Sequence, residues 1–224
     1  MEQWLILLLA MAPGLLWLYY FYSKDKYDPE PVAWVLWIFL LGAAVTVPVA
    51  MLEGLLGTVA GGVLAAVLVA PVCEETAKYL VVKKTVYLSP VFDEPVDGIV
   101  YAAAAGLGFA TVENILYLFS AFDESLMLAI QTGLVRGLLS VPGHVLFSVT
   151  WGTALGMAKF MPGREGGVLV RQGLVLAIAA HALFNYLLFS AIGFAVLVLV
   201  LVPLLWVLAE RHIRNSLAHS FFRE

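Results

Sequence analysis

The segment 70–84, APVCEETAKYLVVKK, places two adjacent glutamates and a lysine in a run that is otherwise apolar enough to cross a membrane. An ionised group at the centre of a bilayer costs about 2.5–3.5 kcal/mol even on the scale derived from insertion experiments, so such residues are functional by default. Glu74 and Lys78 are four residues apart and therefore share one face of a helix. This combination suits either acid–base chemistry or a structural ion pair inside the membrane.

Other apolar runs also carry ionisable groups at depth, namely Glu113, His144 and His181. At about 1.5 Å per residue, these groups and the glutamate pair all lie within about 10 Å of the predicted bilayer midplane. Lipid cannot satisfy such side chains, so they face the interior of the bundle or a wet cavity. One shared polar site is predicted, and each group has a candidate partner four residues along its own helix: Lys78, Tyr117, Ser148 and Asn185.

Two carboxylates, a third carboxylate and two imidazoles are the groups that hydrolysis of a peptide bond requires. A poorly solvated glutamate serves as base and then as acid near neutral pH. Histidine stabilises an oxyanion or binds a metal, and one glutamate with two histidines is a zinc ligand set that leaves a position for water. The sequence has neither HExxH nor GxSxG, and Cys73 would need an imidazole from another helix to act as a nucleophile.

Composition identifies the kind of protein that must position these residues. The chain of 224 residues is 62% hydrophobic and 12% charged, with a mean hydropathy of +0.97, which is typical of a polytopic membrane protein. A span needs about 20 mostly apolar residues, and seven runs qualify. We therefore expect an all-α bundle of about seven transmembrane helices near residues 4–22, 32–52, 61–82, 97–119, 136–158, 171–190 and 193–209.

The positions of lysine and arginine predict the orientation of the bundle. With the N-terminus outside and the C-terminus in the cytoplasm, no lysine or arginine falls in an external loop. Glu53 is assigned to an external turn, Arg136 to the outer interface, and Asp97 to the N-cap of the fourth run. Segment 126–135 either extends the fifth run or lies along the interface.

Charge and the lack of repeats weigh against two classes of protein. The net charge of −4, with basic residues on one membrane face only, argues against nucleic acid as a partner. No internal repeat links the first three runs to later ones, which disfavours the inverted-repeat transporters. The lipid bilayer is the one partner that composition alone implies.

Five short motifs in order resemble those of the PrsW intramembrane proteases, distant relatives of the CAAX prenyl endopeptidases (the ABI superfamily). CEETAKYL is similar to the paired-glutamate motif of that family in its EExxK form, and GFATVENILY to its FxxxEN motif. GHVLFS and HALFN resemble its two histidine motifs, and FYSKDKYDPEP follows the first run. The resemblance extends from about residue 17 to residue 186.

The resemblance implies a multi-pass endopeptidase of the prokaryotic plasma membrane. Its substrate would be a membrane-anchored, single-span protein of the anti-sigma-factor type. Residues 1–210 would form a single transmembrane catalytic domain, and residues 211–224 a cytoplasmic tail. Glu74 and Glu75 match the essential glutamate pair of the family, while His144 and the pair His181 and Asn185 match its histidine motifs.

Two positions depart from the CAAX enzymes. Glu113 stands where those enzymes have a histidine, and Lys78 replaces their arginine, where it tunes or pairs the glutamates. A carboxylate cannot donate a hydrogen bond from the place of a neutral imidazole unless it is protonated, so their mechanism does not transfer directly.

The hypothesis from sequence is that Glu75, with Glu74 supporting or exchanging roles, activates water for attack on a scissile carbonyl. His181 with Asn185 would bind the oxyanion directly or through a metal. Zinc held by Glu113, His144 and His181 is one variant, and a metal-free glutamate-dependent hydrolase is the other. The rival from another class is a proton-coupled transporter of small solutes, in which the same cluster relays protons.

Overall fold

The computed structural model describes residues 1–161 and 164–223, and over these ranges every regular element is helical. The all-α class predicted from the sequence is confirmed. The α-helices are α1 (Glu2–Tyr22), α2 (Val32–Ala60), α3 (Gly62–Leu64), α4 (Ala70–Thr85), α5 (Asp97–Glu124), α6 (Leu126–Val135), α7 (Val141–Lys159), α8 (Glu165–Leu187), α9 (Ala191–Val196) and α10 (Val202–Ala218).

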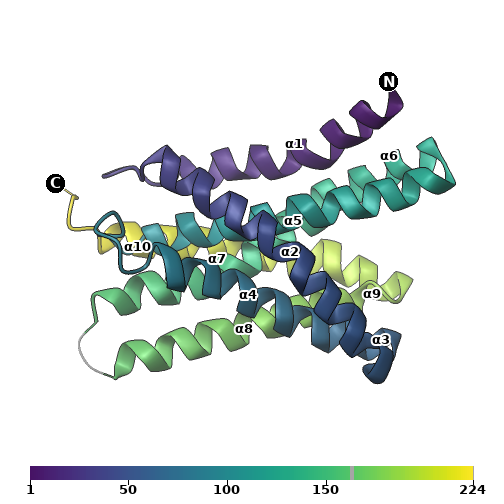
Figure 1. Ribbon diagram of the computed structural model, residues 1–224. Coiled ribbons are helices and arrows are strands. Elements are labelled where there is room, and N and C mark those ends of the chain that lie inside the picture. Colours follow the sequence, from purple (N-terminus) through teal and green to yellow (C-terminus); the bar gives the residue numbers. More distant parts are fainter. Residues whose placement is uncertain (162–163, 224) are drawn as a thin grey trace.

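Six helical stretches in the described residues are long and apolar enough to cross a membrane. The third predicted run, 61–82, is not among them, because it carries three charged residues, Glu74, Glu75 and Lys78, within its apolar stretch. Residues 62–85 are nevertheless helical throughout. The N-terminus and the C-terminus lie at opposite ends of the bundle (Figure 1). The seven-span count and the orientation stay predictions.

Several boundaries differ from those expected. Segment 126–135 forms α6 and continues into α7 as one helical stretch, so it extends the fifth run. The helix α2 continues to Ala60, and Glu53 lies inside it rather than in a turn. The proposed boundary at residue 210 falls within α10, so no break in the helix marks it. Asp97 is the first residue of α5, whose N-cap is Val96, so the N-cap assignment was wrong.

The central helix α5 packs against α1, α2 and α7 and is buried over most of its length. Small residues make this close packing possible. A Cβ atom at Gly98 would collide with the backbone of Gly152 and Gly156 on α7, and one at Gly108 would collide with the backbone of Phe39 on α2. The close backbone approach predicted from AAAAGLG and GTALG is therefore confirmed.

Three π-helical turns, Ala65–Val69, Arg136–Ser140 and Leu197–Leu201, interrupt the α-helical pattern. Each one ends two residues before a proline: Pro71, Pro142 or Pro203. Proline has no N–H and its ring collides with the carbonyl four residues earlier, so a wider turn removes the clash. Two of these turns lead directly into α4 and α7, which carry the glutamate pair and His144.

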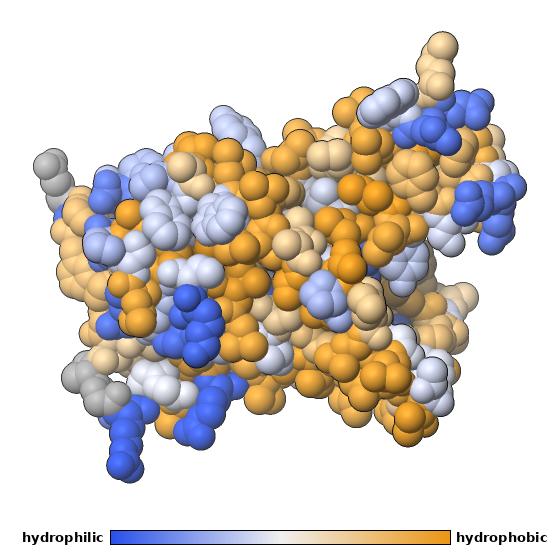
Figure 2. All heavy atoms as spheres, viewed as in Figure 1, coloured by the Kyte–Doolittle hydropathy of each residue, from blue (hydrophilic) through white to orange (hydrophobic). Residues whose placement is uncertain are grey.

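The outer surface of the bundle is apolar. Figure 2 shows hydrophobic side chains over much of the visible face, with the most hydrophilic ones gathered toward its two ends. Large apolar side chains on α1 and α2, such as Leu8, Leu16 and Leu40, are more than half exposed. Such a surface is compatible with lipid rather than water as the surrounding solvent.

Candidate active site

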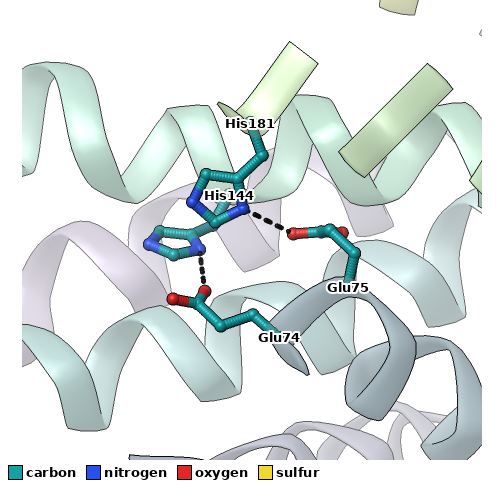
Figure 3. A group of neighbouring side chains, drawn as sticks. All are labelled: Glu74, Glu75, His144 and His181. Atoms are coloured by element: carbon teal, nitrogen blue, oxygen red, sulfur yellow. Dashed lines mark hydrogen bonds and ion pairs between the residues drawn. The ribbon is translucent and has the colours of Figure 1, made fainter. Parts of the chain in front are cut away.

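The ionisable residues predicted to share one site come from four helices and meet inside the bundle. α4 contributes Glu74 and Glu75, α5 contributes Glu113, α7 contributes His144, and α8 contributes His181. Figure 3 shows both histidines directed toward the glutamate pair. The side chains of this pair and of both histidines are almost fully buried.

The ammonium group of Lys78 lies at the centre of this cluster and is completely buried. Its Nζ atom is 3.0 Å from Oε2 of Glu74 and 2.8 Å from Oε1 of Glu75. It is also 2.9 Å from Nδ1 of His144. The predicted pairing of Glu74 with Lys78 is therefore confirmed, and the lysine also joins α4 to α7.

Glu75 is held by four donors and lies behind the cavity described below. Oε1 accepts from Lys78 and lies 3.2 Å from Nδ1 of His181. Oε2 accepts from Ser148 Oγ at 3.2 Å and from Trp151 Nε1 at 3.0 Å. With both oxygens engaged and no exposed surface, this carboxylate fixes its neighbours in place.

Glu74 has a different environment because it faces a cavity of about 250 Å³. Its Oε2 atom lies near Lys78 and 3.5 Å from Nδ1 of His144, whereas Oε1 accepts no hydrogen bond within the described residues. The other cavity-lining residues come from several helices: Glu53, Ala66, Ala70, Glu113, Tyr117, Arg136, Ser140, His144, Phe147, His181, Phe184, Asn185, Leu188 and Phe189. Glu74 is thus the member of the pair that water in the cavity can reach.

Glu113 pairs with an arginine and with His144. Its Oε2 atom is 2.8 Å from Arg136 Nη2 and 2.8 Å from Nε2 of His144. Arg136 also donates from Nε to Asn114 and lies over the ring of Tyr117. The prediction that Arg136 extends to the outer interface was wrong, since the half-buried carboxylate of Glu113 draws the guanidinium toward the cavity.

The partners of the two histidines fix their tautomers. Because Lys78 donates to Nδ1 of His144, the proton of that ring is on Nε2, where it is donated to Glu113. In the neutral form of the His181 ring, with Nδ1 donating to Glu75, the Nε2 atom carries no proton. The His181 ring stacks on Phe147 with centroids 4.6 Å apart. The free nitrogen of His181 is therefore a proton acceptor or a metal ligand.

Asn185 lines the cavity but does not contact His181. Its Nδ2 atom donates to the carbonyl of Ala66 at 2.8 Å. That carbonyl lies in the π-helical turn, where Ala70 N–H bonds Ala65 and the next N–H in the series would belong to Pro71. Because proline has no N–H, Asn185 satisfies a carbonyl that the helix cannot.

Of the four pairs predicted between residues four apart on one helix, only Glu74 with Lys78 forms. Ser148 donates to Glu75 rather than to His144, and Tyr117 packs on Arg136 rather than bonding Glu113. Sequence reasoning missed Glu53, since the apolar run was ended at this acidic residue. It also missed Trp151, although spacing of seven residues from His144 places both on one face of α7.

The donor set fits a metal ion. Glu74, Glu75, His144 and His181 each offer a ligand atom, and these atoms lie within 4.8 Å of one another. Carboxylate oxygens with imidazole nitrogens are typical ligands of zinc. Glu113 is not in this group. Its hydrogen bond to Nε2 of His144 would instead orient that histidine as a metal ligand. Lys78 contacts three of the four residues, so its ammonium competes with a bound ion.

Comparisons with known proteins agree with this site. Residues 30–208 match the family described as PrsW family intramembrane metalloprotease. The chain is 36% identical to Protease PrsW of Geobacillus kaustophilus (strain HTA426), covering 94% of this chain and 92% of that protein. It is 33% identical to Protease PrsW of Clostridioides difficile (strain 630), covering 96% and 92% of the two chains.

A third relative, Protease PrsW of Bacillus subtilis (strain 168), is 35% identical over 88% of each chain. No solved structure matches the chain. The family makes this chain a protease rather than the proton-coupled transporter considered from the sequence. This chain therefore belongs to the PrsW family of intramembrane proteases, as a multi-pass protein of the bacterial plasma membrane.

Proposed function

We propose that this protease hydrolyses a peptide bond of a membrane-anchored, single-span protein, with Glu74 as the group that activates water. The observation that supports this role is the contrast between the two adjacent glutamates. Glu75 has both oxygens occupied and no exposed surface, whereas Glu74 has an oxygen free of hydrogen bonds at the wall of the cavity. The geometry thus favours Glu74 over Glu75 as the base.

In this proposal Glu74 takes a proton from water as the water oxygen attacks the scissile carbonyl carbon. The carbon–nitrogen bond then breaks, and the carboxyl group of Glu74 returns the proton to the leaving amine. Glu75 holds Lys78 and His181 in place during these steps. Lys78 places a positive charge 3.0 Å from Oε2 of Glu74.

The oxyanion requires N–H donors that line the cavity. Neutral His181 has its one N–H directed at Glu75, so its free nitrogen cannot donate. The guanidinium of Arg136 and the second amide N–H of Asn185 are better placed to supply these donors, because both residues line the cavity with Glu74. This differs from the direct oxyanion role for His181 proposed from the sequence.

We assign the metal, where one is bound, to Glu74, Glu75, His144 and His181. Zinc is the ion that this donor set suits, and when bound it supplies Lewis-acid polarisation of a carbonyl. The metal-free alternative uses the ammonium of Lys78 as the only cation at the glutamate pair. Loss of cleavage with a chelator and recovery with zinc select the first alternative; cleavage unchanged by the chelator selects the second.

The substrate class follows from the family resemblance, which implies an anti-sigma-factor-like protein with one span. The apolar outer surface of the bundle supports a substrate that arrives through the lipid. The test is cleavage of a reconstituted single-span substrate by the full chain and by the variants Glu74→Gln and His181→Ala. Asp123→Asn is the matched control, because it also neutralises a carboxylate, but on the exposed end of α5.

Loss of a positioned acid–base group lowers the rate by about 10²–10⁴-fold, and we expect at least the lower figure for Glu74→Gln. The control should cleave at the rate of the unaltered protein. Unchanged rates for both Glu74→Gln and His181→Ala would exclude this cluster as the active site.

A further inference from the structure

A second group of buried carboxylates lies apart from the proposed catalytic cluster: Asp97 begins α5, whereas Glu113 lies 16 residues further along the same helix. Asp25 and Glu30 belong to the connection between α1 and α2, Glu94 to the connection between α4 and α5, and Asp97 to the start of α5. All four are buried, and ligand oxygens of Asp25, Glu94 and Asp97 lie within 4.8 Å of one another. These connections lie at the end of the bundle that is predicted to face the cytoplasm.

Three of these carboxylates each have one oxygen fixed by a donor and the other oxygen left without one. Asp25 Oδ2 accepts from Glu30 N at 3.0 Å, and Asp97 Oδ2 accepts from Asp93 N at 2.7 Å and from Glu94 N at 2.8 Å. Glu30 Oε2 accepts from the hydroxyl of Tyr101. The remaining oxygens, Asp25 Oδ1, Glu30 Oε1 and Asp97 Oδ1, are buried without a partner among the described residues.

Glu94 supplies independent evidence for a missing ligand. Its side chain has no exposed surface, and neither Oε1 nor Oε2 has a hydrogen-bond partner in the described part of the chain. A carboxylate oxygen of Glu94 nevertheless lies beside those of Asp25 and Asp97. A buried carboxylate without any donor is costly, and a cation bound between Glu94, Asp25 and Asp97 would satisfy it.

Lysines in the same region bind other groups. Lys24 pairs with Glu210 at 3.1 Å, and Lys159 donates to the carbonyls of Ser89 and Phe92. Within the described ranges, no lysine, arginine or histidine nitrogen lies within 4.0 Å of Asp25, Glu94 or Asp97.

We propose that Asp25, Glu94 and Asp97, with Glu30 at the edge, bind a divalent cation that clamps two loops to the start of α5. The ligands are all oxygens, which favours Mg²⁺ or Ca²⁺ and distinguishes this site from the mixed nitrogen and oxygen set of the catalytic cluster. One oxygen of Asp25, Asp97 and Glu30 is already oriented by a donor, as in preorganised metal sites. This site is independent of the proposed catalytic mechanism.

The test measures the thermal unfolding midpoint of the full chain in detergent after chelation, with Mg²⁺ and Ca²⁺ titrated separately. A cation that binds only the folded protein raises the midpoint with concentration. We expect this rise in the unaltered protein, in the exposed-charge control Asp123→Asn and in the catalytic-cluster variant Glu75→Gln. Glu94→Gln should weaken cation binding by at least about 10–100-fold, so its midpoint should not respond.

Two results would overturn the proposal. The first is that neither cation changes the unfolding midpoint of the unaltered protein. The clustered carboxyl groups would then be explained by protons that they share. The other is a response that Glu94→Gln retains and Glu75→Gln loses, which would place the cation in the catalytic cavity.

A second measurement covers the case in which Glu94→Gln does not fold. Tb³⁺ bound at this site should emit when tyrosine is excited, because Tyr101 donates to Glu30, and Mg²⁺ or Ca²⁺ should displace it. We expect Tyr101→Phe to lower this emission several-fold, while Tyr186→Phe, on the exposed surface of α8, leaves it unchanged. Equal Tb³⁺ emission from Tyr101→Phe and Tyr186→Phe would contradict the proposal that the cation binds beside Glu30.

Discussion

At the scale of single residues, the two adjacent glutamates do different work because consecutive positions on a helix point in different directions. Glu74 reaches the cavity, while Glu75 faces the packed interior and accepts from four groups. Sequence alone identified both residues but could not rank them. The ranking depends on Ser148 and Trp151, which lie on another helix and reach Glu75 only in the folded chain.

Replacement of each glutamate by glutamine should separate these roles. Glu74→Gln should abolish cleavage and leave the thermal unfolding midpoint nearly unchanged, because only one of its oxygens is bonded. Glu75→Gln should abolish cleavage and also lower the midpoint, since an amide cannot accept from all four donors. Cleavage of a reconstituted substrate and thermal unfolding in detergent measure both effects. Normal stability of Glu75→Gln would contradict the positioning role.

Lys78 gives a second prediction at this scale. Lys78→Met removes the ammonium and leaves two carboxylates buried together, which should cost about 3–5 kcal/mol of stability. The double variant Lys78→Met with Glu75→Gln should recover part of this loss, because one of the uncompensated charges is gone. Denaturant unfolding of both variants tests the coupling, and equal losses would show that Lys78 stabilises the fold by packing alone.

At the scale of elements, the site depends on how closely α5 approaches α7 and on the turns before the prolines. The sequence predicted close approach from its small residues, and the collisions at Gly98 confirm it. It did not predict the π-helical turns, because proline signals a break or kink without stating how the backbone accommodates it. The bond from Asn185 to Ala66 was equally hidden, since it joins residues 119 positions apart.

Gly98→Ala tests the approach of the two helices. The added methyl group meets the backbone of Gly152 and Gly156, which cannot move aside as a flexible side chain would, so a loss of about 1–3 kcal/mol is expected. Gly167→Ala is the matched control, because nothing lies within 4 Å of its Cβ position on α8. It should be neutral or slightly stabilising. Equal stability of the two variants would contradict the close contact.

Asn185 and Pro71 should be coupled energetically. Asn185→Ala leaves the carbonyl of Ala66 unsatisfied, at a cost of about 1–3 kcal/mol. In a Pro71→Ala background the restored N–H can satisfy that carbonyl, so the same substitution should cost less. A double-mutant cycle by denaturant unfolding measures the difference. If the stability losses of Asn185→Ala and Pro71→Ala simply add, Asn185 does not compensate for the missing N–H of Pro71, and its role is confined to the cavity.

At the scale of the whole molecule, composition was enough to predict a membrane-embedded helical bundle, and motif order was enough to predict the family. The number of crossings is harder to predict, because the run that contains Glu74, Glu75 and Lys78 carries more charged residues than any other predicted run. The carboxylates at the other end, Asp25, Glu94 and Asp97, also escaped the sequence analysis. Asp25 and Glu94 lie in two different loops and Asp97 begins α5, and no spacing rule connects them.

The orientation of the bundle is testable with single cysteines in a Cys73→Ser background. Ser125→Cys lies after α5 at the end predicted to be external, and Ser23→Cys lies after α1 at the end predicted to be cytoplasmic; both positions are exposed. A thiol reagent that does not cross membranes should label Ser125→Cys in intact cells and Ser23→Cys only after lysis. The reverse pattern would invert the predicted topology.

The π-helical turn before Pro71 also determines the rotational phase of everything that follows it in α4. An α-helix advances by about 100° per residue, so removing a single residue from Ala65–Val69 would rotate the downstream side chains by that angle. Glu74 would then take the place of Cys73 and Glu75 the place of Glu74, although every residue of the acidic motif would still be present. Homologous chains that differ in length at this turn should therefore be aligned by the phase of the helix and not by the motif alone.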